Sequence, residues 1–289
     1  MDIIKGKVLF AVPKKGRLYE HVMAYLKQAD IAISRSSRSD VAICTSIPEL
    51  AIFFIPAKDI AYFVGQGDVD FGITGLDVIK ESKVKVEQLL NFDFGCCSLC
   101  LQAPIGSIKD ISQLSGKKVV TSFPNLAKDY LSQQNLAKLP EIRAVSGSVE
   151  VACHLGLADA VIDLVQTGET MRAAGLELVD SILDSSPVLI ANHNSPHKNL
   201  IGVVKRRLEG IKISHKYCLI EYNIKKENRY LGEKLTPGFQ SPTVLALEDD
   251  AWVAIKSMVL KTSINRLLDE LPKVGASAIL VHGLENCRV

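Results

Sequence analysis

One stretch of the sequence brings together a carboxylate, hydroxyl groups and a glycine where an apolar run ends. Residues 159–176 read DAVIDLVQTGETMRAAGL, in which a predicted buried strand meets Asp163 and a short helical phrase follows the turn at Gly168. Such a turn presents backbone N–H groups, which bind anions, whereas a carboxylate accepts hydrogen bonds from sugar hydroxyls. The spacing therefore predicts a ribose-phosphate site.

The residues of this turn have distinct predicted tasks. Thr167 is expected to cap the helix, Gly168 to let an anion approach the backbone closely, and Thr170 to add a hydroxyl group. The alternative is an ordinary capped helix after a strand, which is common and needs no ligand. The predicted binding segment comprises Asp163, Leu164, Val165, Gln166, Thr167, Gly168, Glu169 and Thr170.

A second group of charges follows the first predicted strand. The sequence VPKKGRL places Lys14, Lys15 and Arg17 around Gly16, between a strand and a helix. Taken alone, these charges are typical of a solvated loop. Opposite a ribose-phosphate turn across a cleft, they would instead hold a pyrophosphate.

A third phrase, GQGDVDFGITGLD over residues 65–77, is rich in glycine and acid. Its glycines do not have the G-x-G-x-x-G spacing of a dinucleotide-binding turn. The phrase is equally typical of tight turns at both ends of a strand over residues 70–74.

These segments belong to an alternation of β-rich runs and helical phrases, which predicts an α/β fold. One set occupies about the first ninety residues and a second begins near residue 99, so we expect two lobes with a ligand cleft between them. From about Lys216 the order becomes β-α-β-β-α-β, which is ferredoxin-like. This third domain has no evident catalytic task and is typical of a regulatory appendage.

Composition excludes several classes of function. The 289 residues include 34 basic and 32 acidic side chains spread along the chain, so we expect no nucleic-acid partner. No apolar segment approaches the roughly 18 residues of a membrane span and no export signal is evident, which predicts no membrane partner and a cytoplasmic location. The odd count of seven cysteines favours reduced thiols, and Cys97 and Cys100 fall on opposite faces of a predicted strand.

Five segments occur in the order found in the ATP phosphoribosyltransferase family, which opens histidine biosynthesis: PKKGRL, FVGQGDVDFGITGLD, FGCCSLCLQAP, SFPNLAKDYL and LADAVIDLVQTGETMRAAGL. TPGFQSPTV and VGASAILVHGLENCRV resemble the C-terminal domain of its long form. The resemblance covers essentially the whole chain. Ala61, Cys153 and Ala174 depart from the commoner family residues, but none of them removes a charge or hydroxyl group from the predicted site.

The resemblance implies a two-lobed core of the periplasmic-binding-protein type II fold, followed by a ferredoxin-like (ACT-like) regulatory domain. We expect lobe I over residues 1–92 and 180–211, lobe II with the phosphoribosyl pyrophosphate loop over 93–179, and the regulatory domain over 212–289. Long-form members assemble from dimers into hexamers, so we also expect a homo-oligomer.

The resemblance further implies that N1 of the adenine of ATP attacks the anomeric carbon of 5-phosphoribosyl 1-pyrophosphate, from which pyrophosphate departs. Asp163 would hold the ribose hydroxyls, and residues 167–170 the 5′-phosphate. The cofactor Mg²⁺ would be coordinated by the diphosphate oxygens of the substrate, with no direct protein ligand expected. The predicted catalytic residues are Asp163, Arg17 and Lys14, and further predicted substrate contacts outside the loop come from Gly16, Asp70 and Asp77.

Histidine is the expected feedback inhibitor, bound by the third domain. A histidine site needs an acceptor for the ammonium group, donors for the carboxylate and a small surface for the side chain. The residues predicted to supply these are Asn223, Phe239, Thr243 and Ala278.

Two other classes remain as alternatives. A solute-binding protein shares the two-lobed architecture but catalyses no reaction. An ordinary nucleobase phosphoribosyltransferase normally carries two adjacent acids before the threonine-glycine turn, whereas here Leu164 and Val165 follow Asp163.

Overall fold

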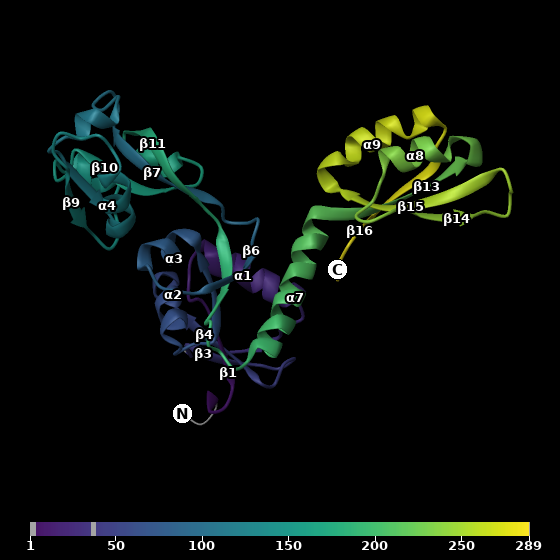
Figure 1. Cartoon of the computed structure of the whole chain (residues 1–289), viewed down its shortest axis with the longest axis horizontal. Coiled ribbons are helices and arrows are strands. Elements are labelled where there is room, and N and C mark those ends of the chain that lie inside the picture. The colour runs from purple at the N-terminus through teal and green to yellow at the C-terminus, as the bar shows by residue number, and fades with distance from the viewer. Residues whose placement is uncertain (1–3, 36–38, 289) are drawn as a thin grey trace. The chain divides into compact units, whose positions relative to one another are not determined.

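The computed structural model describes residues 4–35 and 39–288, and its three β-sheets with flanking helices confirm the predicted α/β class (Figure 1). The chain divides into two compact units. The first comprises residues 1–24 and 31–202 and contains predicted lobe II and most of predicted lobe I. The second comprises residues 25–30 and 203–289, so it takes in residues 25–30 and 203–211, which were predicted for lobe I. Within the described ranges, no helix is both long enough and apolar enough to cross a membrane.

Lobe I is built on a seven-stranded sheet with the order β2-β3-β4-β1-β5-β12-β6. Helix α2 packs so closely on this sheet that a Cβ atom at Gly72 would collide with Ile60, which explains the glycine inside β5. The strands are β1 (Val8–Pro13), β2 (Ile33–Ser34), β3 (Val41–Cys44), β4 (Leu50–Ile55), β5 (Phe71–Gly75), β6 (Glu87–Asn91) and β12 (Pro187–Ala191). The helices are α1 (Arg17–Gln28), α2 (Ala57–Gln66) and α3 (Leu76–Ser82).

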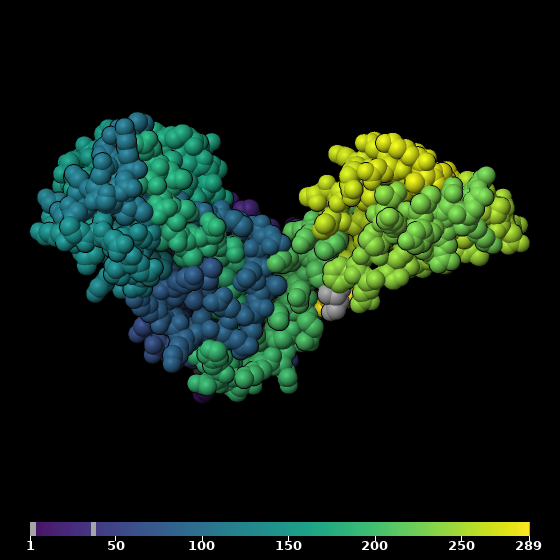
Figure 2. Space-filling view, turned by 45° about the horizontal axis from the view of Figure 1, so that its top comes forward, coloured from purple at the N-terminus to yellow at the C-terminus, as the bar shows by residue number. Residues whose placement is uncertain are grey.

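Lobe II is a five-stranded sheet with the order β11-β7-β10-β8-β9, and apolar clusters cover both of its faces. Ala160 and Ile162 pack on the face of Phe123 and Leu131, whereas Val161 packs on the opposite face. The strands are β7 (Cys97–Pro104), β8 (Lys118–Thr121), β9 (Glu141–Ala144), β10 (Ala160–Val165) and β11 (Leu176–Ser185). The helices are α4 (Pro124–Ser132), α5 (Val151–His154) and α6 (Glu169–Ala173), with a 3₁₀ turn over Ile111–Leu114. Figure 2 shows lobe I in blue against lobe II in teal.

The C-terminal unit has the predicted ferredoxin-like order. Its antiparallel sheet runs β14-β15-β13-β16, and α8 and α9 cover one face (Figure 1). Alternate residues of β13, among them Ile220 and Tyr222, are buried on the helix side, and Glu221 and Asn223 point to the other face. The elements are α7 (Lys198–Lys216), β13 (Tyr217–Lys225), α8 (Arg229–Leu235), β14 (Thr243–Ala246), β15 (Trp252–Leu260), α9 (Ile264–Glu270) and β16 (Ser277–Gly283), with 3₁₀ turns over Lys226–Asn228, Lys261–Ser263 and Pro272–Val274.

The structure differs from the sequence-based boundaries at two places. β11 pairs with β7 along its length and carries the lobe II sheet to Ser185, past the predicted boundary at residue 180. The predicted boundary at residue 212 falls inside α7, which is one continuous helix. In both cases a regular element continues across the predicted boundary.

Candidate active site

A cleft of about 640 Å³ lies between the two lobes, within the size range of small-ligand sites. In lobe I, β1 is parallel to β4 and β5, so the segments that follow these strands meet at one sheet edge and bring Arg17, Lys58 and Asp77 to the cleft. In lobe II, β8 and β10 are parallel, and Phe123 and Asp163 come from their carboxyl ends. The cleft is therefore lined by the carboxyl ends of strands from both lobes.

Asp163 is half-buried on the face of β10 that carries Val161, because side chains alternate along a strand. Burial raises the pKa of its carboxyl group, and the charge of Glu150 adds to this, although the N–H of Leu164 donates to Oδ1 at 2.8 Å and lowers it. The carbonyl oxygen of Asp163 accepts a hydrogen bond from Gln102 Nε2 at 3.2 Å. Asp163 thus offers a fixed, partly desolvated acceptor to the cleft.

The turn after β10 also lines the cleft, from Leu164 to Thr170. The N-cap of α6 is Gly168, in the left-handed conformation at φ 74°, and not Thr167 as predicted. Thr167 Oγ1 accepts only a long hydrogen bond, 3.4 Å, from the Glu169 N–H, because the glycine turns the chain one residue later. A Cβ atom at Gly168 would lie 2.7 Å from Arg172 Nη1, so the flexible end of that arginine would have to shift.

Only part of the predicted cationic turn reaches the cleft. Arg17 lines it, and its Nη1 donates to Gln166 Oε1 of lobe II at 3.0 Å. Lys14 does not line it and instead forms an ion pair with Asp40, with Nζ 2.8 Å from Oδ1. Gly16 adopts φ 86° and supports the turn without lining the cleft.

The two predicted acids of the glycine-rich phrase are separated by β5. Asp77 is buried at the cleft, and its Oδ1 accepts the hydroxyl of Ser185 at 2.5 Å. Asp70 lies at the other end of the strand, where it accepts hydrogen bonds from the Leu9 N–H and the Ser195 hydroxyl, 2.9 and 2.7 Å away. Asp70 therefore has a structural role there and does not line the cleft, because five strand residues span about 16 Å.

Several cleft residues were not singled out from the sequence. Lys58 is the second residue of α2, three positions after the apolar run of β4, and recognising LAIFFI as a strand would have pointed to it. Gln102 is a buried polar residue inside the largely apolar β7. His21 lies one helical turn after Arg17, and its ring stacks on Phe94 with centroids 5.1 Å apart; nothing in the sequence distinguishes it from a solvated helix residue.

Cys97 also lines the cleft, but burial, with the charge of Asp77 as a second cause, raises the pKa of its thiol to about 11. The predicted strand over this segment is confirmed by β7. A thiol with so high a pKa is protonated at neutral pH and is a poor nucleophile. The cleft thus contains no activated cysteine at this position.

The predicted regulatory residues are spread over the C-terminal sheet and the loop between α8 and β14. Asn223 of β13 pairs with Ser277 of β16, beside Ala278, which has a positive φ of 49°. Thr243 on β14 lies two strands away from β13. Phe239 packs edge-on against Tyr217, at the opposite end of β13 from Asn223, with ring centroids 5.4 Å apart. The pairing of β13 with β16 thus brings Asn223 next to the segment that carries Ala278.

Comparison with known proteins identifies the family. Residues 56–210 match the family model HisG, ATP phosphoribosyltransferase, and residues 214–286 match HisG_C, the HisG C-terminal domain. The ATP phosphoribosyltransferases of Yarrowia lipolytica and Saccharomyces cerevisiae are 45% and 43% identical to this chain over the full length of both proteins.

Solved structures agree on the fold of the core. The ATP phosphoribosyl transferase (HisG:HisZ) complex from Thermotoga maritima matches 70% of this chain and 98% of its own, with 26% identity and a TM-score of 0.61. A putative L-cystine ABC transporter from Listeria monocytogenes covers 70% of this chain and 89% of its own at 15% identity and a TM-score of 0.50, which bears on the fold alone. The matches to both family models and to full-length relatives show that the chain belongs to the ATP phosphoribosyltransferase family.

Proposed function

We propose that this chain transfers the phosphoribosyl group of 5-phosphoribosyl 1-pyrophosphate to N1 of the adenine of ATP, releasing pyrophosphate, as the first step of histidine biosynthesis. Family membership supports the reaction. One observation supports its location: the half-buried Asp163 and the turn that follows it face Arg17 and Lys58 across a single cleft. A carboxylate with backbone amides on one side and cations on the other suits a ribose phosphate that carries a leaving diphosphate.

The chemistry follows from these positions. A bond forms between adenine N1 and the anomeric carbon as the bond from that carbon to the pyrophosphate oxygen breaks, through a cationic, oxocarbenium-like state. The carboxylate of Asp163 accepts hydrogen bonds from the ribose hydroxyls and places negative charge near the cationic ring. The amides and hydroxyls of residues 167–170 hold the 5′-phosphate. Arg17 and Lys58 stabilise the departing pyrophosphate.

The cleft suits a magnesium ion that is carried by the substrate. Within residues 4–35 and 39–288, no three His, Cys, Asp or Glu side chains converge as a metal site. The carboxylates that line the cleft, Asp77, Glu150, Asp163 and Glu169, fit an ion that takes most of its ligands from diphosphate and water. When bound, Mg²⁺ supplies charge neutralisation to the leaving diphosphate.

Product analysis tests the proposed reaction. Purified protein incubated with both substrates and Mg²⁺ should release pyrophosphate and form an equal amount of an adduct with the mass of phosphoribosyl-ATP. Omission of either substrate should abolish both products. Binding of one substrate with no adduct would favour the solute-binding alternative instead.

We also infer feedback inhibition by histidine, with its site centred on Asn223 and Ala278, which are neighbours on β13 and β16. Phe239, in the loop between α8 and β14, and Thr243, on β14, contribute to the same inhibition. The test compares the wild type with Asn223→Leu and Thr243→Arg at rising histidine concentration. Coupling of typical size changes substrate affinity about 5- to 150-fold. No inhibition of the wild type at millimolar histidine, or variants that remain as sensitive to histidine as the wild type, would contradict the proposal.

Assembly into dimers and hexamers is part of the same proposal. The face of the C-terminal sheet opposite α8 and α9 exposes about half of Leu245 and Leu280, which are 51% and 53% accessible. Apolar side chains on an uncovered sheet face support association of subunits. Light scattering at micromolar concentration should give a mass at least twice the 31.5 kDa of one chain.

A further inference from the structure

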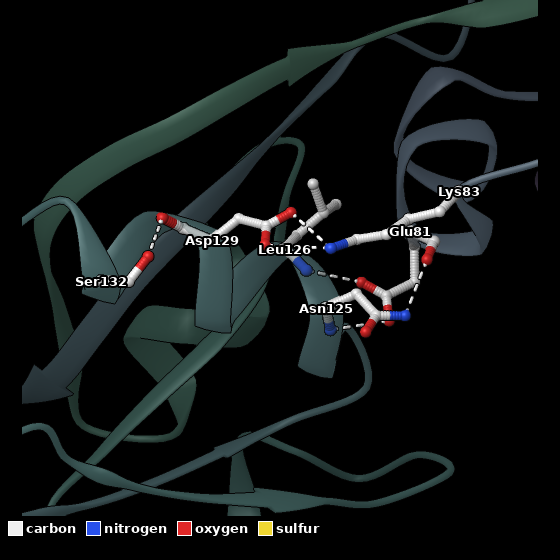
Figure 3. Close-up of polar contacts among 6 residues, drawn as sticks. All are labelled: Glu81, Lys83, Asn125, Leu126, Asp129 and Ser132. Atoms are coloured by element: carbon white, nitrogen blue, oxygen red, sulfur yellow. Dashed lines mark hydrogen bonds and ion pairs between the residues drawn. The ribbon is translucent and has the colours of Figure 1, made fainter.

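Helix α4 of lobe II begins without a capping side chain of its own. Phe123 occupies the N-cap position and Pro124 the first helical position, so the N–H groups of the next two residues need acceptors from outside the helix. The carboxylate of Glu81 accepts both: Asn125 N lies 2.9 Å from Oε1, and Leu126 N lies 2.9 Å from Oε2 (Figure 3). A carboxylate at this position satisfies two donors and is favoured by the helix dipole.

This cap comes from the other lobe. Glu81 lies in the last turn of α3, which belongs to lobe I, and its backbone carbonyl also accepts the Asn125 side-chain amide at 3.0 Å. The start of α4 is therefore fully hydrogen-bonded only while the two lobes keep this arrangement. Interlobe geometry and the first turn of α4 are linked through one side chain.

Hydrogen bonds continue from this contact to the proposed ribose acceptor. The Phe123 N–H donates to Thr121 Oγ1 at 2.9 Å, and the Thr121 hydroxyl donates to the Ile162 carbonyl at 2.7 Å. Ile162 directly precedes Asp163, and Thr121 is fully buried. The end of β10 that carries Asp163 is thus tied to the residues that open α4.

On the lobe I side, the same short helix carries a second cleft residue. Asp77 lies four positions before Glu81 on α3 and is held by Ser185. The contact between Glu81 and α4 therefore connects the elements that carry Asp77 and Asp163, one on each side of the cleft.

We propose that Glu81 is a positioning residue for the phosphoribosyl transfer: by capping α4 across the lobes it fixes Asp163 relative to Arg17 and Asp77. The role rests on the proposed function, since it concerns the geometry of that substrate site. Glu81 does not line the cleft and acts only through α4 and the strand end behind it. Without the cap, part of the binding free energy of the substrate is used to order the interlobe arrangement, so substrate affinity falls. Once the substrate is bound, the arrangement of the lobes is the same as in the wild type, so kcat changes little.

A neighbouring ion pair provides a matched control. Lys83 Nζ lies 2.9 Å from Asp129 Oδ2, so this pair also joins α3 to α4, but both side chains are about half exposed (Figure 3). Exposed pairs contribute little to stability. Asp129→Asn removes this interlobe ion pair with almost no change in side-chain size, and it leaves the cap of α4 intact.

The test measures pyrophosphate release while 5-phosphoribosyl 1-pyrophosphate is varied at saturating ATP. Glu81→Ala should raise KM about tenfold with kcat within about threefold of the wild type. The KM of Glu81→Gln, which keeps one acceptor oxygen, should lie between those of the wild type and Glu81→Ala. The KM of Asp129→Asn should stay within about twofold of the wild type. Hydrogen exchange of residues 123–128 provides the second readout: it should be faster in both Glu81 variants and slow again when the substrate saturates them.

The outcomes separate the two proposals. A wild type that releases no pyrophosphate contradicts the proposed function. An active wild type with an unchanged KM in Glu81→Ala, or a loss confined to kcat, overturns the positioning role. If Glu81→Ala does not fold, as judged by its melting curve, the KM and exchange of Glu81→Gln decide the question alone: wild-type values of both overturn the role.

Discussion

Arg17 of lobe I donates a hydrogen bond from Nη1 to Gln166 Oε1 of lobe II, 3.0 Å away, and both residues line the cleft. Both side chains are exposed. An arginine has five N–H donors, so this bond leaves further donors for a substrate anion. Of the three charged residues in the predicted cationic turn, Arg17 alone lines the cleft. Its bond to Gln166 places it directly beside the predicted phosphate loop.

The two partners of this bond should differ strongly in importance. Gln166→Ala removes an exposed, neutral hydrogen-bond partner, and we expect kcat/KM to fall by no more than about threefold. Arg17→Ala removes charge-assisted hydrogen bonds to pyrophosphate, worth about 1.5–3 kcal/mol each, and should lower kcat/KM about 10- to 100-fold or more. Steady-state kinetics on both variants provide the comparison. Equal losses would mean that Arg17 serves only the interlobe bond.

The sequence contained enough information to predict the chemistry of the loop but not its neighbours. The segment from Asp163 to Thr170 is continuous, so its grouping needed no tertiary information. Lys58 reaches the cleft because β4 ends at the same sheet edge as β1, and Gln102 because β7 pairs with β10, so both depend on tertiary structure. Asp70 and Asp77 looked equivalent in sequence, and only the direction of β5 separates them.

Asp163 should show a conflict between affinity and stability. Burial raises the pKa of its carboxyl group in the folded state, so the folded protein holds this proton more tightly than the unfolded chain does. This contribution therefore lowers the free energy of unfolding as the pH rises through the ordinary and then the raised pKa. Asp163→Asn should raise the melting temperature at pH 7 while weakening substrate binding, and the gain should disappear at acidic pH. A lower melting temperature at pH 7 would contradict this assignment.

Gly168 is required by its backbone conformation. An alanine at φ 74° costs about 1–2 kcal/mol, and its Cβ atom would press on Arg172. Gly168→Ala should therefore weaken substrate affinity about tenfold, measured by calorimetry. Gly175→Ala is the matched control, because it has a similar φ of 65° but no atom within 4 Å of the new Cβ and lies outside the cleft. Equal affinity losses in both variants would show that the effect is not local to the loop.

The cleft thiol should be chemically quiet. With a pKa of about 11, roughly one Cys97 in a thousand is ionised at pH 8, whereas the adjacent Cys96 is exposed. Iodoacetamide should label Cys96 well before Cys97, as followed by peptide mass spectrometry, and Cys97→Ser should keep turnover within about threefold. Rapid alkylation of Cys97 with loss of activity would instead indicate a reactive thiol.

Helix caps mark the limit of local sequence reasoning in this chain. Thr167 was the natural candidate to cap α6, yet the left-handed Gly168 takes the position. The start of α4 shows no capping residue at all in its own sequence, because Glu81 supplies the acceptor from the other lobe. Propensity rules describe a helix end and its immediate neighbours, and here the acceptor lies more than forty positions away.

The central claim is that transfer occurs in this cleft with Asp163 as the ribose acceptor. The direct measurement is pyrophosphate release by the wild type and Asp163→Ala, with both substrates present and 5-phosphoribosyl 1-pyrophosphate varied. Loss of a charged hydrogen-bond partner costs about 1.5–3 kcal/mol, so we predict at least a tenfold lower kcat/KM for this substrate with an unchanged melting profile or a more stable fold. Wild-type kinetics in Asp163→Ala would contradict the account.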